Sequence, residues 1–317
     1  MAGTAVKDGW TLGDAPSLDG KVAIVTGATG GLGYETALGL VRRGATTILA
    51  GRNPAKGAAA LSRLRQTIPV IDARFEMLDL GSLASVARFA TVVGEAHGAV
   101  DILVNNAGVM SLPVRTLTGD GFEQQFGVNY LAHFALTARL KDLLCKAEGG
   151  GRVVSVASLA HKRAALDLDD LQSEKSYDPM RAYGRSKLAM LIFAIELQRH
   201  AVQHHWNLCS VASHPGWART DIFDNGPGSG ERGLGLKGRL MKGVFSMLAQ
   251  SSRDGALPSL YAAMAPQVVG GSYYGPTGPG ETRGAPGMAR ISAQAADPVV
   301  GSRLWALSEQ LTGLTFG

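Results

Sequence analysis

The sequence predicts an α/β fold, in which one doubly wound parallel sheet of about seven strands carries helices on both faces. From residue 21 onward, short β-branched runs alternate with longer runs of helical periodicity. This alternation favours a parallel sheet, because each return to a parallel strand needs a crossover that is usually a helix. No change of composition and no Pro/Gly linker interrupts residues 21–220, so we expect a single domain.

The expected elements follow one another directly along the chain. The strands are KVAIVT, TTILAG, RFEMLDL, DILVNNAG, RVVSVAS and NLCSVASHPG. The helices are YETALGLVRRG, AAALSRLRQ, SLASVARFATVVGEAH, residues 121–145 and the run that contains AYGRSK. Residues 1–20 are expected to be an N-terminal extension, and 21–317 the single domain. Residues 159–182 are expected to be a loop with short helical turns.

A second departure from the alternation covers residues 221–253, which are rich in glycine and also contain LKGRLMKGVFSMLAQ. A long excursion inside a compact domain is usually functional or disordered. We interpret it as a substrate lid. The alternatives are a disordered insertion, or an amphipathic patch that rests on a membrane surface with Arg232, Lys237, Arg239 and Lys242 towards the headgroups.

The composition is that of a globular chain of 317 residues, with 45% hydrophobic and 18% charged residues. The formal charge is +5, but Lys and Arg are spread thinly, which argues against nucleic-acid binding and suits an anionic ligand. Cys145 and Cys209 have no CxxC or His partner and are interpreted as reduced core residues. With no signal-peptide pattern and no run of about 18 apolar residues, we expect a soluble, cytoplasmic protein without a transmembrane segment.

A glycine-rich turn, TGATGGLG at residues 26–33, follows the first strand and opens a helix. Gly27, Gly31 and Gly33, with Leu32 between them, would let helix N-terminal amides approach a pyrophosphate. A glycine cluster alone could be a tight turn. Its place between a strand and a helix near the start of the repeat favours dinucleotide binding on a Rossmann fold.

The end of the second strand indicates which dinucleotide is bound. An NAD-selective site has an acidic residue here for the ribose 2′-hydroxyl, whereas this sequence has Arg52 and Asn53 in ILAGRNP. The guanidinium of Arg52 could bind a 2′-phosphate, although it could also be an exposed loop arginine. We therefore expect NADP(H) in preference to NAD(H).

The stretch AYGRSK places Tyr183 four residues before Lys187 in a helical run, so both side chains lie on one helix face and can reach a common ligand. Such pairs also arise by chance. Tyr177 and Arg181 have the same spacing, but Pro179 lies between them and should keep them off one helix face.

Four histidines are expected to have no direct catalytic role. His200 and His204 lack the carboxylates or HExxH pattern of a metal site, and we interpret them as an exposed helix end. His161 and His214 flank the proposed site in the sequence and are interpreted as structural or supporting residues.

From 21 to about 275, the chain resembles the short-chain dehydrogenase/reductase family. The cofactor motifs are the glycine turn, the adenine-contacting pair Asp79 and Leu80, and NNAG at 105–108 with Asn106, Ala107 and Gly108. The motif PGWART has Pro215, Gly216 and Thr220, which the resemblance places beside the nicotinamide. The residues that match the family's catalytic set are Asn129, Ser158, Tyr183 and Lys187. The residue 159–182 interval and YGRSKLAMLIF are similar to the retinol dehydrogenase and protochlorophyllide reductase branch. Ala157 departs from the family, which commonly has serine there.

This resemblance implies hydride transfer between a nicotinamide and a bulky, largely apolar carbonyl or alcohol. Tyr183 would exchange the proton, Lys187 would stabilise the phenolate and hold the ribose, Ser158 would donate to the substrate oxygen, and Asn129 would hold a relay water. The alternatives are reduction of a carbon–carbon double bond and a non-catalytic NADP(H) sensor. The helices at 121–145 and 181–204 could also bury a homo-oligomer interface.

Overall fold

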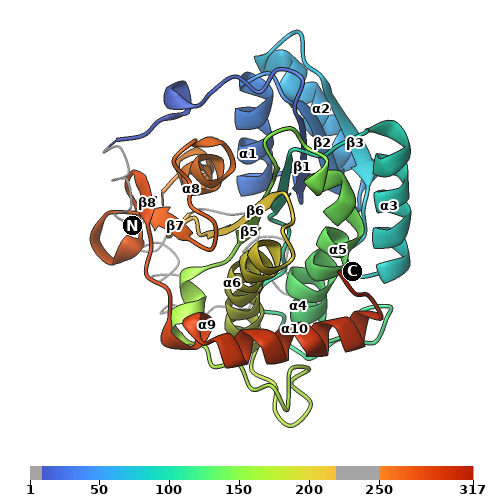
Figure 1. The fold of residues 1–317 in the computed structure, drawn as a ribbon, viewed down its shortest axis with the longest axis vertical. Coiled ribbons are helices and arrows are strands. Elements are labelled where there is room, and N and C mark those ends of the chain that lie inside the picture. The colour runs from blue at the N-terminus through green and yellow to red at the C-terminus, as the bar shows by residue number, and fades with distance from the viewer. Residues whose placement is uncertain (1–8, 219–249, 317) are drawn as a thin grey trace, which may run out of the picture.

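The computed structural model describes residues 9–218 and 250–316, which form an eight-stranded sheet in the order β3-β2-β1-β4-β5-β6-β7-β8 (Figure 1). The strands are β1 (Val22–Thr26), β2 (Thr46–Gly51), β3 (Ala73–Met77), β4 (Ile102–Asn105), β5 (Gly151–Val156), β6 (Leu208–Ser213), β7 (Tyr273–Pro276) and β8 (Pro286–Met288). All neighbouring strands are parallel except β7 and β8, which are antiparallel. The predicted α/β fold is confirmed, with eight strands instead of about seven.

Among the described residues, the helices before β8 lie between the strands, as the alternation predicts, and the last two helices follow β8. The helices are α1 (Gly31–Arg42), α2 (Pro54–Thr67), α3 (Leu83–Ala96), α4 (Gln124–Phe126), α5 (Ala132–Cys145), α6 (Pro179–Gln203), α8 (Ser252–Met264), α9 (Ala293–Ala296) and α10 (Pro298–Thr312). Short 3₁₀ turns cover Leu12–Asp14, Leu159–Arg163 and Pro279–Glu281, and a π-helical turn covers Gly127–Leu131. The π-helical turn joins α4 to α5 and contains Asn129.

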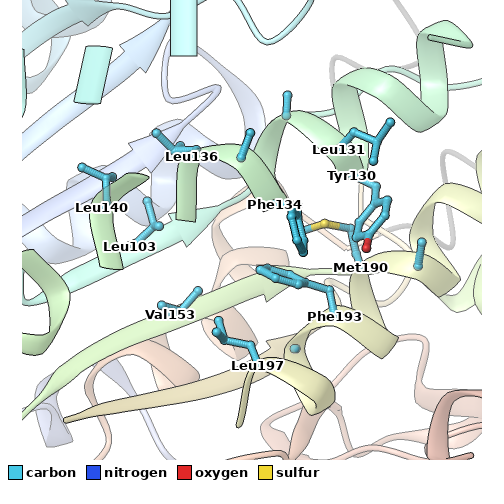
Figure 2. Close-up of a cluster of buried hydrophobic side chains, with 14 of the residues drawn as sticks. Leu103, Tyr130, Leu131, Phe134, Leu136, Leu140, Val153, Met190, Phe193 and Leu197 are labelled. Carbon is cyan, nitrogen blue, oxygen red and sulfur yellow. The ribbon is translucent and has the colours of Figure 1, made fainter. Parts of the chain in front are cut away.

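Two apolar layers cover the sheet. On one face, residues of α1, α2 and α8 pack against β1 and β2, and on the other, residues of α3, α5 and α6 form the larger core. Phe134 of α5 and Phe193 of α6 face each other in that core, with ring centroids 5.6 Å apart (Figure 2). Because the chain winds outward from β1 through β2 to β3 and then returns to β4, the winding direction reverses between β1 and β4. Crevices at such a reversal bind ligands at the carboxyl ends of the strands.

The described part of the N-terminal extension packs against the domain. Trp10 is 2% exposed, and its ring meets Tyr261 of α8 edge-on at 5.3 Å. The backbone N–H of Leu18 donates to the carbonyl of Arg43 at the end of α1. Residues 9–20 therefore belong to the body of the domain.

In the C-terminal segment, α10 lies against α6, and its Trp305 also meets Phe134 in the first turn of α5 (Figure 1). Trp305 and Phe316 are buried against Phe134 and Phe193. The ammonium of Lys141 donates to the carbonyl of Phe316. Aromatic residues of the same chain thus pack against both helices that we considered for an oligomer interface.

Most of the expected lid, and all four cations of the alternative membrane patch, lie outside the described residues. The flanking residues are held together, since Ala218 forms an isolated parallel bridge with Gln250. The backbone N–H of Gln250 donates to the carbonyl of Trp217 at 2.8 Å. Within 9–218 and 250–316, no helix is long and apolar enough to cross a bilayer.

Candidate active site

A cleft of about 1750 Å³ opens at the carboxyl ends of the central strands. It runs from the glycine-rich turn and the end of β2, past the end of β4, to the first turns of α6. Most of the predicted site residues line it: Gly27, Gly31, Leu32, Gly33, Arg52, Asn53, Asp79, Leu80, Asn106, Ala107, Gly108, Ser158, Tyr183, Lys187, Pro215 and Gly216. Asn129 lies behind the wall, and Thr220 lies outside the described residues.

The glycine turn needs glycine at two positions for different reasons. Gly27 has φ of +67°, a left-handed conformation in which a side chain is strained. A Cβ on Gly33 would lie 2.4 Å from the carbonyl oxygen of Gly27 and 2.5 Å from Nδ2 of Asn106. The turn therefore packs β1, α1 and the segment after β4 so closely that backbone amides line the cleft, a fit for a pyrophosphate.

The outer end of the cleft is cationic. Arg52 and Asn53 line it as predicted, and the side chain of Asn53 caps α2 by accepting from the N–H of Lys56 at 3.0 Å. Lys56 and Arg63 also line it, and the guanidinium of Arg63 lies 3.9 Å from the ring centroid of Tyr34. The sequence analysis missed both residues. Their spacing of seven residues on α2, which places them on one helix face, is the signal that could have found them.

The predicted adenine pair lies beside these cations. Leu80 is almost completely buried, and Asp79 accepts the N–H of Gly81 at 2.9 Å through its carboxylate. The backbone N–H of Asp79 donates to the hydroxyl of Ser85 at 3.0 Å. This turn after β3 is thus fixed by its own hydrogen bonds and presents its surface to the cleft.

Ser158, Tyr183 and Lys187 meet at the inner end of the cleft. Burial raises the pKa of Tyr183, and a hydrogen bond with Ser158 opposes this rise in pKa only in part. Lys187 is 3% exposed, burial lowers its pKa from 10.5 to about 8, and its ammonium donates to the carbonyl of Val156 at 2.8 Å. Stabilisation of the Tyr183 phenolate by Lys187 stays a prediction. The site holds Tyr183 as a neutral phenol because burial dominates.

Asn129 is completely buried, and its side chain is already fully engaged. Its amide oxygen accepts the N–H of Val109 at 2.7 Å, and its amide nitrogen donates to the carbonyl of Val109 and to the hydroxyl of Ser186, each at 2.9 Å. Its main-chain carbonyl lies 2.9 Å from Nδ1 of His133. The role that the sequence analysis gave Asn129 is to hold a relay water. That role stays a prediction.

The wall beyond the phenol contains a buried polar cluster that the sequence analysis identified only in part. The backbone N–H of Gly216 donates to Nδ1 of His214 at 3.1 Å, and Nε2 of His214 lies 3.2 Å from the carboxylate of Glu281. Lys162 donates to the same carboxylate at 2.9 Å. Burial lowers the pKa of His214 to about 4, so the imidazole is neutral near pH 7. His161 lies alongside, with Nδ1 2.7 Å from the carbonyl of Ser158. Both histidines thus support the walls of the cleft.

Tyr177 and Arg181, which have the same spacing as Tyr183 and Lys187, do not share a helix face, as Pro179 predicts. Pro179 is the first residue of α6, so Tyr177 precedes the helix and donates its hydroxyl to the carbonyl of Leu112 at 2.8 Å. His200 and His204 stack on each other at the helix end, with ring centroids 5.7 Å apart. Among the described residues, no cluster of His, Cys, Asp or Glu could hold a metal ion.

The fold and the cleft agree with the family comparison. A family model described as short chain dehydrogenase matches residues 21–227. The chain therefore belongs to the short chain dehydrogenase family, whose members are oxidoreductases that bind a nicotinamide cofactor.

The relatives refine this assignment. The chain is 41% identical to retinol dehydrogenase 13 of Homo sapiens over 322 residues, which include 99% of this chain and 92% of that protein. Polyprenol dehydrogenase of Homo sapiens is 38% identical over 264 residues, covering 81% of this chain and 77% of that protein. A crystal structure of an uncharacterized protein from Mycobacterium Paratuberculosis has 37% identity and a TM-score of 0.79, with 98% of this chain and 99% of that chain covered. The chain lies in the retinol dehydrogenase-like branch, as the motifs predict.

Proposed function

We propose that the protein is an NADP(H)-dependent oxidoreductase that transfers a hydride between the nicotinamide and a bulky, largely apolar carbonyl or alcohol. The observation that carries this proposal is the meeting of Ser158, Tyr183 and Lys187 at the inner end of the cleft, with the glycine turn and Arg52 at its outer end. One cofactor lying along the cleft would bring its phosphates to the turn and its nicotinamide to the phenol.

The cationic outer end supports NADP(H) over NAD(H). Arg52, Lys56 and Arg63 line the place where an NAD-selective site needs a carboxylate. A 2′-phosphate adds negative charge and acceptor oxygens, which a guanidinium can bind through two parallel hydrogen bonds. The ring of Tyr34 beneath Arg63 would orient that second guanidinium.

The bound cofactor would supply or accept the hydride, and the chain's own residues would handle the proton. In the reducing direction, negative charge develops on the substrate oxygen, and the neutral phenol of Tyr183 can donate its proton there. The hydrogen-bonded hydroxyl of Ser158 would donate to the same oxygen. In the oxidising direction, Tyr183 must first lose its proton, which burial opposes.

An apolar substrate is supported by the wall of the cleft and by the relatives. Met110, Met180 and Trp217 are among the residues that line the cleft. Retinol and polyprenol, which the relatives' names contain, are both long apolar alcohols. These observations favour a carbonyl or alcohol on an apolar body over a small polar substrate.

Replacing Tyr183 by Phe tests the proposed function. Turnover of NADPH with a panel of apolar aldehydes, ketones and enones should be lost, whereas the dissociation constant for NADPH should change by at most about threefold, because the hydroxyl acts on the substrate. Tyr177→Phe is a matched control, since it removes a tyrosine hydroxyl outside the cleft. Turnover by Tyr183→Phe at the wild-type rate would rule out the proposed acid/base role, and activity on enones alone would favour double-bond reduction.

A further inference from the structure

His133 on α5 connects two hydrogen-bonded clamps that hold the floor of the cleft. The floor is the segment Asn106–Val109, which follows β4 and lines the cleft. At one end, the backbone N–H groups of Asn106 and Ala107 both donate to Oγ1 of Thr26, each at 2.9 Å. At the other end, Asn129 binds both the N–H and the carbonyl of Val109 through its side-chain amide.

The imidazole of His133 forms a hydrogen bond to a residue of each clamp. Its Nδ1 lies 2.9 Å from the main-chain carbonyl of Asn129, and its Nε2 lies 2.9 Å from Oγ1 of Thr26. A carbonyl can only accept, so Nδ1 carries the proton and Nε2 is the acceptor in the neutral ring. The hydroxyl of Thr26 then donates to Nε2. Its alternative acceptor, the carbonyl of Val104, is farther away at 3.4 Å.

Burial and charge keep the ring in this one form. His133 is completely buried, and burial lowers its pKa to about 4, with the nearby Lys187 acting in the same direction. A second proton on Nε2 would point at a Thr26 oxygen that already accepts two N–H groups. In the series of hydrogen bonds from the floor through Thr26 and His133 to Asn129, each bond therefore pairs one donor with one acceptor.

The position of Asn129 in the π-helical turn explains why this connection matters. A wider turn of this kind interrupts the regular ladder of helix hydrogen bonds, and such turns are frequent at functional sites. Its side chain also borders Gly108, where an added Cβ would lie 3.2 Å from the amide oxygen of Asn129 and 3.5 Å from Nζ of Lys187. A small displacement of Asn129 would move both the floor and the surroundings of the catalytic lysine.

We propose that His133 is a positioning residue that locks the cleft floor Asn106–Val109 by tying Thr26 to the main-chain carbonyl of Asn129. This inference rests on the proposed function for its catalytic consequence, but the locking of the floor is a property of the cofactor-free protein. Loss of the imidazole should loosen the floor, weaken cofactor binding and slow turnover.

Hydrogen exchange in the cofactor-free, full-length protein tests the lock directly. In His133→Leu, the amides of Asn106 and Ala107 should exchange at least about tenfold faster than in the wild type, since a lost buried hydrogen bond has about this effect on a local opening equilibrium. Thr26→Val should produce the same change, and Thr26→Ser, which keeps the hydroxyl, should not. If His133→Leu does not fold, His133→Asn provides the test, because its amide can still donate to the carbonyl of Asn129 but is too short to reach Thr26.

Tyr130→Phe is the matched control. It removes a buried hydroxyl next to Asn129 that bonds to Ser308 of α10 and not to the floor. Its floor amides should keep wild-type exchange rates even if the protein is less stable. Equal acceleration in Tyr130→Phe, or unchanged rates in the folded His133 variant, would overturn the proposal.

A double-variant cycle extends the test to function. His133→Leu and Thr26→Val should each raise the dissociation constant for NADPH about tenfold. The dissociation constant of the double variant should be at most about twofold higher than that of the single variant that binds NADPH more weakly, because both changes break the same chain of hydrogen bonds. Multiplication of the two single effects would contradict a shared chain. If the wild type binds no NADPH, the proposed function fails, while the exchange result still decides whether His133 locks the floor.

Discussion

The buried imidazole of His133 should make part of the protein's stability depend on pH. Burial lowers its pKa from the ordinary 6.5 to about 4, so the folded protein keeps the ring neutral at pH 5 to 6 while the unfolded chain protonates it. The unfolded state then binds one more proton, and the free energy of unfolding must fall as the pH falls below 6.5. The stabilisation is complete above the unfolded pKa and is lost as the pH approaches the folded one.

The size of this effect follows from the two pKa values. At about 1.4 kcal/mol per pH unit for one proton, lowering the pH from about 7.5 to about 5 removes about 2 kcal/mol of unfolding free energy through His133 alone. The low pKa of His214 adds a similar dependence, which is the same in the wild type and in a His133 variant and therefore cancels in their difference.

Urea unfolding followed by tryptophan fluorescence can measure this difference. Between about pH 7.5 and about pH 5, His133→Leu should lose about 2 kcal/mol less stability than the wild type, although it is less stable at the higher pH. His205→Asn serves as the control, because His205 is exposed and has φ of 55°, a conformation that asparagine tolerates. The reasoning is refuted if wild type and His133→Leu lose the same free energy over this interval.

Three further predictions concern the cleft. Arg52→Ala should weaken the binding of NADPH by about 1.5 to 3 kcal/mol and that of NADH much less, as measured by titration of each cofactor. Arg65→Ala is the control, because Arg65 is exposed and does not line the cleft. Equal losses of binding for both cofactors would place Arg52 away from a 2′-phosphate. Gly33→Ala should abolish cofactor binding because its Cβ would clash with the turn, whereas Gly98→Ala, with open space around it, should bind normally in the same titration. Because burial raises the pKa of Tyr183, alcohol oxidation should become faster as the pH rises above neutrality, and a rate profile that falls over this range would contradict the phenol as the base.

The sequence was sufficient where local patterns dictate structure. The β-branched run before the glycine turn predicts β1 and α1, and the i, i+4 spacing of Tyr183 and Lys187 predicts that both face the cleft from α6. The last two strands were not identified, because YYGP and PGM contain the glycine and proline that strands usually lack.

Other features depend on residues that only the folded chain brings together. Glu281 meets Lys162 across 119 positions of sequence, and no local pattern links them. The engagement of the Asn129 side chain, and the connection of His133 to Thr26 across 107 positions, arise in the same way. The i, i+4 spacing predicts a cation near Tyr183 but cannot show the burial that raises the pKa of Tyr183.

The bridge between Ala218 and Gln250 has a consequence for divergence among relatives. Ala218 and Gln250 are fixed side by side, so we expect a change in the number of residues between them to leave the rest of the domain in place. We therefore expect relatives to differ in the length of this segment without a change in the cofactor cleft.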